Sequence, residues 1–284
     1  MRWGDGWGSG FLGVMIFSGS LPATRVAVAE FSPVFLTSAR AVLAAFLGAA
    51  LLTGLRQPRP SRTDLGALAL VSLGVVVGFP LLTALALQHI TAAHSIVFVG
   101  LLPLATAVFG VLRGGERPRP AFWLFSGAGS LTVVIFALLQ GGGSLKGDLL
   151  MLAAIVLCGL GYAEGAVLSR RLGGWQVICW ALLLSLPPML ILAVLVRPAD
   201  FAAVTLPAWL CLAYVSIFSM LVGFVFWYRG LARGGIAGVG QLQLLQPFFG
   251  LLLAGLLLGE PVQWAMIFVT VLVVACVAGA KRFA

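Results

Sequence analysis

The chain has 284 residues, of which 61% are hydrophobic and only 9% are charged, and its formal net charge is +9 at pH 7. A soluble domain carries about a quarter charged residues, so this composition excludes an ordinary soluble protein. It predicts a protein that lies in a lipid bilayer.

Apolar runs fill most of the chain, each close to the roughly 20 residues that a membrane-spanning helix needs. They are far longer than the ~10-residue strands of a membrane barrel. The first run has no convincing signal-peptide cleavage site, and we expect it to be a helix. The sequence therefore predicts an all-α integral membrane protein with ten transmembrane helices. Their expected positions are 8–25, 34–54, 65–87, 92–112, 121–140, 148–169, 175–196, 206–228, 236–258 and 262–280.

Positive charge is unevenly distributed among the predicted loops. With the amino terminus placed in the cytoplasm, thirteen of the 17 Lys and Arg residues lie inside, whereas only Arg25, Lys146 and Arg197 lie outside. This bias follows the positive-inside rule, so the charge sets topology and indicates no nucleic-acid partner. We expect both termini in the cytoplasm. The excess of arginine over lysine, 15 to 2, suggests a GC-rich bacterial genome and hence a bacterial inner membrane.

Other chemistry leaves little trace in the sequence. Cys158, Cys179, Cys211 and Cys276 fall inside predicted helices, without a CxxC motif or a His/Cys cluster. We expect them to be packing residues and predict neither a metal nor a cofactor. No GxxxxGK[ST] phosphate loop occurs, which excludes ATP-driven pumping by this chain alone.

One pattern occurs twice in the chain. Pro103 precedes Glu116 by thirteen residues, and 144 residues later Pro247 precedes Glu260 by the same spacing. Five predicted helices separate the two copies, so the second copy is inverted relative to the first. Inverted repeats are a recurring architecture of secondary transporters. We predict two five-helix repeats, 1–140 and 148–284, joined by a Gly-rich outer linker at 141–147.

The two stretches "PLATAVFGVLRGGE" and "PFFGLLLAGLLLGE" each close the fourth helix of a repeat. In this respect the chain resembles the drug/metabolite transporter superfamily and is most similar to its EamA-type metabolite exporters; in size it resembles the bacterial amino-acid exporters among them. The resemblance implies a central cavity lined mainly by the third and fourth helices of each repeat. It also implies a small-molecule substrate, an amino acid or related metabolite. Arginines around Glu116 depart from the second copy and predict an ion-paired glutamate there.

The repeated prolines have a physical meaning of their own. A proline inside a helix leaves the carbonyl four residues earlier without a donor, so Pro103 would free Val99 and Pro247 would free Gln243. Two interpretations stay open, a static kink and a substrate-facing hinge.

Polar residues inside a spanning helix are candidate site residues, because a central charge costs roughly 2.5–3.5 kcal/mol. Glu164 is the only carboxylate well inside a predicted span, and its structural interpretation is pairing with Arg170 or Arg171. Arg40 is the only helix-embedded cation, and we expect it to extend to the outer interface or to pair with Glu30.

The remaining candidates are uncharged. His94 and Phe98 share a helix face, and Gln243 and Gln246 share another, where amides could hold an α-amino or carboxylate group. Each pair has a structural alternative in hydrogen bonding or packing between helices. The candidate substrate-binding residues are Phe79, His94, Phe98, Tyr162, Glu164, Trp180, Phe224, Trp227, Gln243 and Gln246.

These features predict a secondary transporter that exports small metabolites, amino acids above all, by alternating access. Two alternatives stay open: a carrier of another small solute, such as a lipophilic drug or a nucleotide sugar, and an integral-membrane enzyme. An enzyme would need a cluster of acid, base or metal ligands that the sequence lacks. With Arg40 as its sole helix-embedded cation, the chain disfavours a dianionic substrate. The solute, the coupling ion and the oligomeric state are not readable from the sequence.

Overall fold

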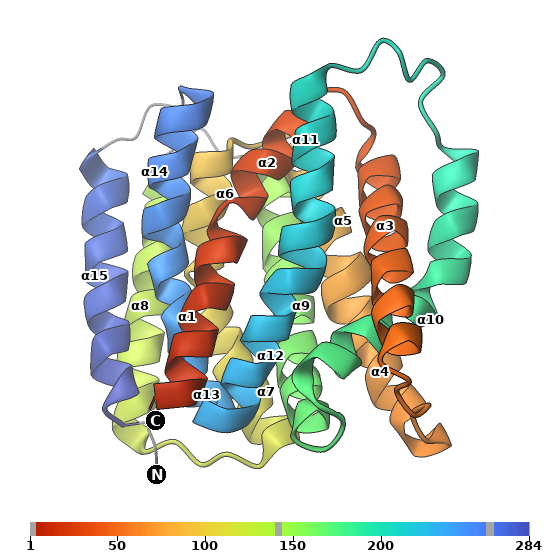
Figure 1. Ribbon diagram of the computed structural model, residues 1–284. Helices are drawn as coiled ribbons and strands as arrows, with labels where there is room; N and C mark the ends of the chain where they lie inside the picture. The colour runs from red at the N-terminus through yellow and green to blue at the C-terminus, as the bar shows by residue number, and fades with distance from the viewer. Residues whose placement is uncertain (1–3, 140–143, 260–263, 284) are drawn as a thin grey trace.

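The computed structural model describes residues 4–139, 144–259 and 264–283. Within these ranges every regular element is a helix and no strand occurs (Figure 1). The prediction of an all-α membrane protein is confirmed by six helices that are long and apolar enough to cross a bilayer. These are Gly6–Ala27, Pro33–Gly54, Arg62–Ala86, Leu145–Leu172, Gly174–Leu195 and Leu206–Gly234.

The elements follow the predicted apolar runs closely. In the first half they are α1 (Gly4–Ser18), α2 (Ser20–Ala27), α3 (Pro33–Gly54), η1 (Arg62–Asp64), α4 (Leu65–Val71), η2 (Ser72–Gly78), α5 (Phe79–Ala86), α6 (Ala92–Val99), α7 (Leu102–Gly114) and α8 (Pro120–Leu139). In the second half they are α9 (Leu145–Leu172), α10 (Gly174–Leu195), α11 (Leu206–Tyr214), η3 (Val215–Val222), α12 (Gly223–Gly234), α13 (Ile236–Gly240), η4 (Gln241–Leu245), α14 (Gln246–Leu258) and α15 (Trp264–Lys281).

The break between α6 and α7 corrects the expectation that Pro103 lies inside one continuous helix. Helix α6 ends at Val99, whose carbonyl cannot accept a hydrogen bond from Pro103 because proline has no N–H. After this point the Leu101 N–H donates to the Phe98 carbonyl at 2.9 Å, which closes a tighter turn. Pro103 thus falls in the first turn of α7, where a missing N–H costs little. Pro247 holds the same second position in α14, after the 3₁₀ turn η4. Both prolines begin helices rather than bend them.

Two long helices contain a π-helical segment, η2 before α5 and η3 before α12. Segments of this kind widen the turn by one residue and are frequent at functional sites. Neither was visible in the apolar pattern, since a π-turn needs no special residue type. Within η2, a Cβ on Gly74 would lie 2.9 Å from the Gly161 Cα, so glycine here permits close packing of η2 against α9.

Packing brings the two halves of the chain together throughout the bundle. Helix α3 packs along α10, α8 along α15, and α1 along α12, while α5 and α7 pack against α9. Several elements correspond at the spacing of the repeated motif: α7 and α14 begin and end 144 residues apart, and α8 and α15 begin 144 residues apart.

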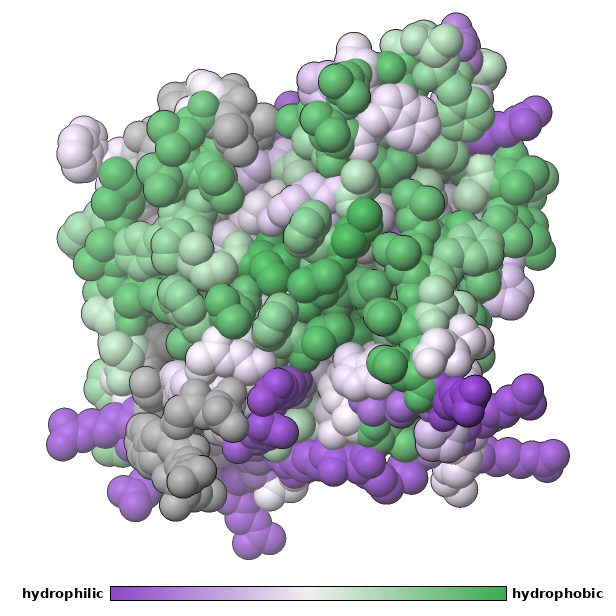
Figure 2. All heavy atoms as spheres, viewed as in Figure 1, coloured by the Kyte–Doolittle hydropathy of each residue, from purple (hydrophilic) through white to green (hydrophobic). Residues whose placement is uncertain are grey.

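The outer surface of the bundle is largely apolar. Large side chains such as Leu124, Leu131 and Phe268 are exposed, as expected of residues that contact lipid tails rather than water. Figure 2 shows hydrophilic side chains concentrated at one end of the visible face, and both termini lie at this end (Figure 1).

Candidate substrate site

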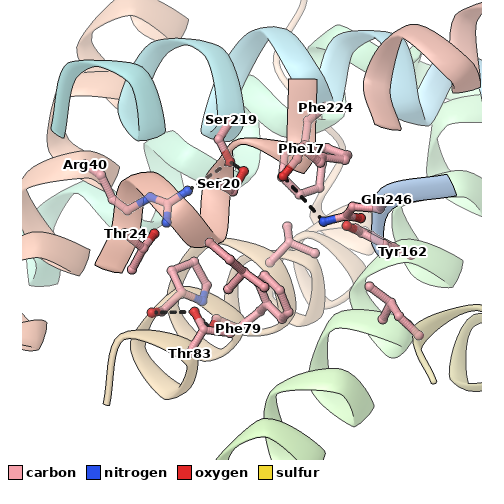
Figure 3. Close-up of a pocket in the computed structure, with 14 residues that line it drawn as sticks. Phe17, Ser20, Thr24, Arg40, Phe79, Thr83, Tyr162, Ser219, Phe224 and Gln246 are labelled. Carbon is pink, nitrogen blue, oxygen red and sulfur yellow. Dashed lines mark hydrogen bonds between the residues drawn. The ribbon is translucent and has the colours of Figure 1, made fainter. Parts of the chain in front are cut away.

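A cavity lies where ten elements from both halves of the chain meet, from α1 to α14 (Figure 3). It offers about 30 Å³ to the centres of water-sized spheres, whereas one water needs roughly 10–15 Å³ on this measure. In this conformation the cavity has room for about two waters. A metabolite can occupy it only if the surrounding helices move apart.

One end of the cavity is polar and carries Arg40 of α3. The side chain is buried, and its Nη2 donates to the Val215 carbonyl oxygen at 3.1 Å and to Ser219 Oγ at 3.3 Å. Ser219 Oγ also accepts a hydrogen bond from Ser20 Oγ at 2.7 Å. Thr24 lies beside the guanidinium (Figure 3). The turn of η3 therefore holds the arginine from one side only.

The position of Arg40 corrects the sequence interpretation. The side chain does not extend to the interface, and Glu30 is engaged elsewhere: its carboxylate accepts from the Thr205 hydroxyl at 2.6 Å and from the Thr205 backbone N–H at 2.7 Å. These hydrogen bonds, the hydroxyl first, lower the pKa of Glu30. Arg40, which the sequence analysis picked out as the only cation embedded in a predicted helix, is part of the cavity wall.

Arg40 has no counterion in the described part of the chain. Its Nε is buried and has no hydrogen-bond partner there. A buried cation without a counterion carries a desolvation penalty that one carbonyl and one hydroxyl offset only in part. Among the described residues, ion pairs join Arg113 to Glu164, Arg170 to Glu116 and Arg171 to Asp64, and Asp148 is hydrogen-bonded to His94.

The other end of the cavity is aromatic. The rings of Phe17 and Phe224 meet edge to face with centroids 5.0 Å apart, and Tyr162 meets Phe224 at 5.9 Å. Trp227 is fully buried and contacts this group from behind, 5.4 Å from Tyr162. Offset and edge-to-face geometries are the favourable ones for aromatic pairs, so this wall is well packed.

Gln246 adds a polar group to the aromatic end. Its Nε2 donates to the Phe17 carbonyl oxygen at 3.4 Å, while its Oε1 is buried and has no partner in the described ranges. Figure 3 shows Gln246 on the opposite side of the cavity from Arg40. The cavity thus pairs a cationic end with an aromatic end that carries a free acceptor.

The lining residues repeat the 144-residue spacing of the sequence motif. Val75 in η2 corresponds to Ser219 in η3, Pro80 to Phe224, and Leu102 to Gln246. Equivalent positions of the two halves therefore contribute to one cavity.

Four of the ten candidate residues line this cavity: Phe79, Tyr162, Phe224 and Gln246. The other six do not. Trp227 supports the wall, and Trp180 of α10 packs against the apolar core in a partly buried position. Gln243 is fully buried, with both amide atoms unpartnered in the described part of the chain.

His94 and Phe98 also lie away from the cavity, on α6. Their rings are 5.4 Å apart, which confirms that they share a face. His94 Nε2 is 2.9 Å from Asp148 Oδ1 of α9, so the histidine links two helices. Of the two candidate pairs, only Gln246 lines the cavity at Arg40, and His94, Phe98 and Gln243 do not.

Glu164 lies away from the cavity and forms an ion pair. Its Oε1 accepts from Nε of Arg113, with the carboxylate side chain 5% exposed and the arginine 50% exposed. The expected partners, Arg170 and Arg171, are wrong, because each reaches a different acid.

Glu116 joins the two halves of the chain. Its oxygens accept from the backbone N–H groups of Ile236 and Ala237, each at 2.7 Å, and Arg170 Nη2 lies 3.4 Å away. The expected ion pair is present, although the arginine comes from α9 and not from the neighbouring sequence. Glu260, the second glutamate of the motif, lies outside the described residues.

A wider hollow, with a volume of about 660 Å³, opens at the arginine-rich end of the molecule. Arg170, Arg171, Arg229 and Arg233 line it together with Trp175. Arg170 and Arg171 lie in the last turn of α9, and Arg229 and Arg233 lie in α12. Basic residues at the ends of spanning helices are what the positive-inside rule leads us to expect, so their charge has an explanation other than substrate binding. The cavity at Arg40 remains the better candidate, since its charge has no such explanation.

Comparison with known proteins identifies the family. The model of the EamA-like transporter family matches residues 3–138 and again residues 145–280. The chain belongs to the EamA-like transporter family. This confirms the resemblance to the drug/metabolite transporters seen in the sequence, and it points to a transporter rather than an enzyme.

Individual relatives agree with this assignment. The chain is 67% identical over 281 residues to a protein named "Uncharacterized transporter YdeK" from Bacillus subtilis, covering 99% of this chain and 98% of that one. It is 24% identical over 256 residues to a protein named "Probable terminal-alkyne amino-acid exporter" from Streptantibioticus cattleyicolor, covering 88% and 84%. A crystal structure 19% identical in sequence superposes with a TM-score of 0.77 over 100% of both chains, which shows the shared fold.

Proposed function

We propose that this EamA-type protein is a secondary transporter that exports small metabolites, amino acids being the favoured class, with the cavity at Arg40 as its substrate site. The observation that carries the proposal is the cavity itself: it lies between equivalent positions of two halves, and its present volume admits only water. A transporter whose site opens to one side at a time passes through such a closed state.

The proposal includes ten spanning helices arranged as two inverted repeats. The family model matches residues 3–138 and again 145–280, which supports two repeats. We propose 1–140 and 148–284 as their extents, with 141–147 as the linker. The 144-residue correspondence of α7 with α14 supports them as well. So does the packing of α3 against α10 and of α8 against α15, since equivalent helices meet where a pseudo-twofold axis passes between the halves.

Both the membrane and the substrate class enter as proposals. The arginine-rich end that carries both termini is placed in the cytoplasm of a bacterial inner membrane. An amino acid suits a cavity with one cation and an aromatic wall, and one relative is named an amino-acid exporter at 24% identity. A nucleotide sugar would bring two or more negative charges to a cavity whose described lining has one cation.

Uptake into proteoliposomes tests the proposal. Liposomes with the purified protein are loaded with unlabelled amino acids and then offered labelled amino acids, a labelled nucleotide sugar or a labelled lipophilic amine. We expect counterflow of one or more amino acids above the level of empty liposomes. Counterflow of only the nucleotide sugar or only the amine would replace the substrate class, and no counterflow of any solute would contradict the transporter proposal.

A further inference from the structure

Arg40 is a charged group for which the described residues provide no counterion. Its guanidinium is buried within α3, only Nη2 makes hydrogen bonds in the described ranges, and Nε has no partner. Four acidic side chains in the described ranges already contact other basic groups: Asp148 contacts His94, Glu164 contacts Arg113, Glu116 contacts Arg170, and Asp64 contacts Arg171. A lone cation inside a membrane protein marks a site by default.

We infer that Arg40 binds the carboxylate group of the transported solute and that the solute supplies the missing negative charge. This rests on the proposed function and names the chemical class of its substrate. A carboxylate is planar and accepts two parallel hydrogen bonds from one guanidinium. The free Nε of Arg40 provides a donor that η3 does not occupy.

The rest of the cavity defines the rest of the solute. A phosphate or dicarboxylate would bring a second charge, for which the described lining has no second cation. Phe17 and Phe224 face the cavity from the end away from Arg40, and Phe79 lines it between the two ends (Figure 3). The occupant is therefore a monocarboxylate with an apolar body. Gln246 Oε1 has no partner in the described ranges and can accept a hydrogen bond from a donor on the solute, such as an amino group.

The arrangement also links binding to the shape of the transporter. Nη2 of Arg40 reaches across from α3 to the carbonyl of Val215 in the π-helical segment η3. A carboxylate on Nε would thus be held between an element of the first half and one of the second. The negative charge of a bound carboxylate offsets the desolvation penalty of the buried Arg40. The occupied cavity is therefore favoured over the empty one.

Matched pairs of acids and amides test the inference directly. L-Phenylalanine and L-leucine are each compared with the corresponding carboxamide, which keeps the shape and the amino group but lacks the negative charge. Binding is measured by ligand-induced thermal stabilisation of the detergent-purified protein. We expect the wild-type protein to bind at least one acid tenfold or more tightly than its amide. In Arg40→Gln and Arg40→Met the ratio should fall to about one, while affinity for the amide is retained.

Two further variants serve as controls. Arg25→Gln removes an arginine of α2 that donates to the Leu87 carbonyl and does not line the cavity, and it should leave the acid preference unchanged. Arg40→Lys keeps the charge and should restore part of the preference. Arg40→Met also guards against misfolding, because an apolar residue of similar length in place of a buried charge is often neutral for stability or stabilising.

The outcomes separate this inference from the proposed function. If both Arg40→Gln and Arg40→Met keep a tenfold acid preference, or if the wild-type protein binds neither acid more tightly than its amide, the inference is wrong, whatever the counterflow shows. If the acid preference depends on Arg40 but no solute crosses the liposome membrane, the carboxylate site stands and the transporter proposal fails.

Discussion

Arg113 and Glu164 form an ion pair whose two sides differ in burial, with 50% and 5% of the side chains exposed. Arg113→Gln leaves a carboxylate alone in an apolar surrounding, whereas Glu164→Gln leaves an arginine that water can solvate. We expect Arg113→Gln to cost about 1–3 kcal/mol of unfolding free energy and Glu164→Gln clearly less. Thermal unfolding in mild detergent measures both. Loss of substrate binding in Glu164→Gln without loss of stability would instead return Glu164 to the site.

Gln246 and Gln243 are three residues apart but have different surroundings. Gln246 lines the cavity, whereas Gln243 is fully buried and its amide has no partner in the described part of the chain. We expect Gln246→Leu to reduce transport by about tenfold, equivalent to about 1.4 kcal/mol, at unchanged stability. Gln243→Leu should leave the unfolding temperature equal or higher, since replacing an unsatisfied buried polar group by an apolar one is neutral or stabilising. Equal transport rates for Gln246→Leu and the wild-type protein would remove this amide from the site.

At the scale of elements, Glu116 holds the first turn of α13 by accepting from two of its backbone N–H groups. Charge-assisted bonds at a helix start are strong, and Glu116→Gln removes the charge while Glu116→Ala removes both acceptors. We expect Glu116→Ala to cost about 1–3 kcal/mol of unfolding free energy. Arg170→Gln breaks only the 3.4 Å contact and should cost less than about 1 kcal/mol. If thermal unfolding shows equal losses for the two, the ion pair and not the helix contact dominates.

The helix breaks before α7 and α14 are the places where a hinge role of the two prolines can be tested. Pro103→Ala supplies the N–H that Val99 lacks and lets α6 run on into α7, and Pro247→Ala does the same for Gln243 and α14. If the halves are inverted mates, the two variants shift the balance of inward-open and outward-open states in opposite directions. A shift of about 1.4 kcal/mol changes that ratio tenfold.

Labelling of single cysteines at the ends of α7 and α14 measures this balance in each proline variant, without substrate. Opposite changes in reactivity support paired hinges. Changes in the same direction, or none while transport continues, make the breaks static features of the fold.

For the whole molecule, the proposed topology can be tested with exposed positions at its two ends. Lys146 is the second residue of α9, and Arg229 lies in the second half of α12; both are exposed. In a variant without native cysteines, we expect Lys146→Cys to react with a membrane-impermeant reagent in intact cells. Arg229→Cys should react only after the membrane is opened. The reverse pattern would invert the topology, and equal reactivity at both positions would overturn the map.

The sequence predicted the helices well because each apolar run reports its own length, from 34–54, found as Pro33–Gly54, to 175–196, found as Gly174–Leu195. It predicted partners poorly. Arg40 meets Val215, 175 residues away, and His94 meets Asp148, 54 residues away. Such pairs depend on how helices rotate and pack, which composition does not encode. Phe224 and Trp227 of the aromatic wall were candidates in a predicted cavity helix, whereas Phe17 of the first helix was missed. The π-helical segments left no residue signal.

The contact between Arg40 and Val215 has a consequence for biogenesis. The ribosome completes α3 long before η3 exists, because 175 residues separate the two partners. At about 5–20 residues per second, the delay is about 10–35 seconds. During that time the guanidinium of α3 lacks its partner in η3. The span Pro33–Gly54 keeps a mean hydropathy of 1.9 even with Arg40 included, so its apolar residues must hold the helix in the membrane. The translocon therefore accepts the arginine on the strength of its neighbours, and the cavity comes into being only when the second half arrives.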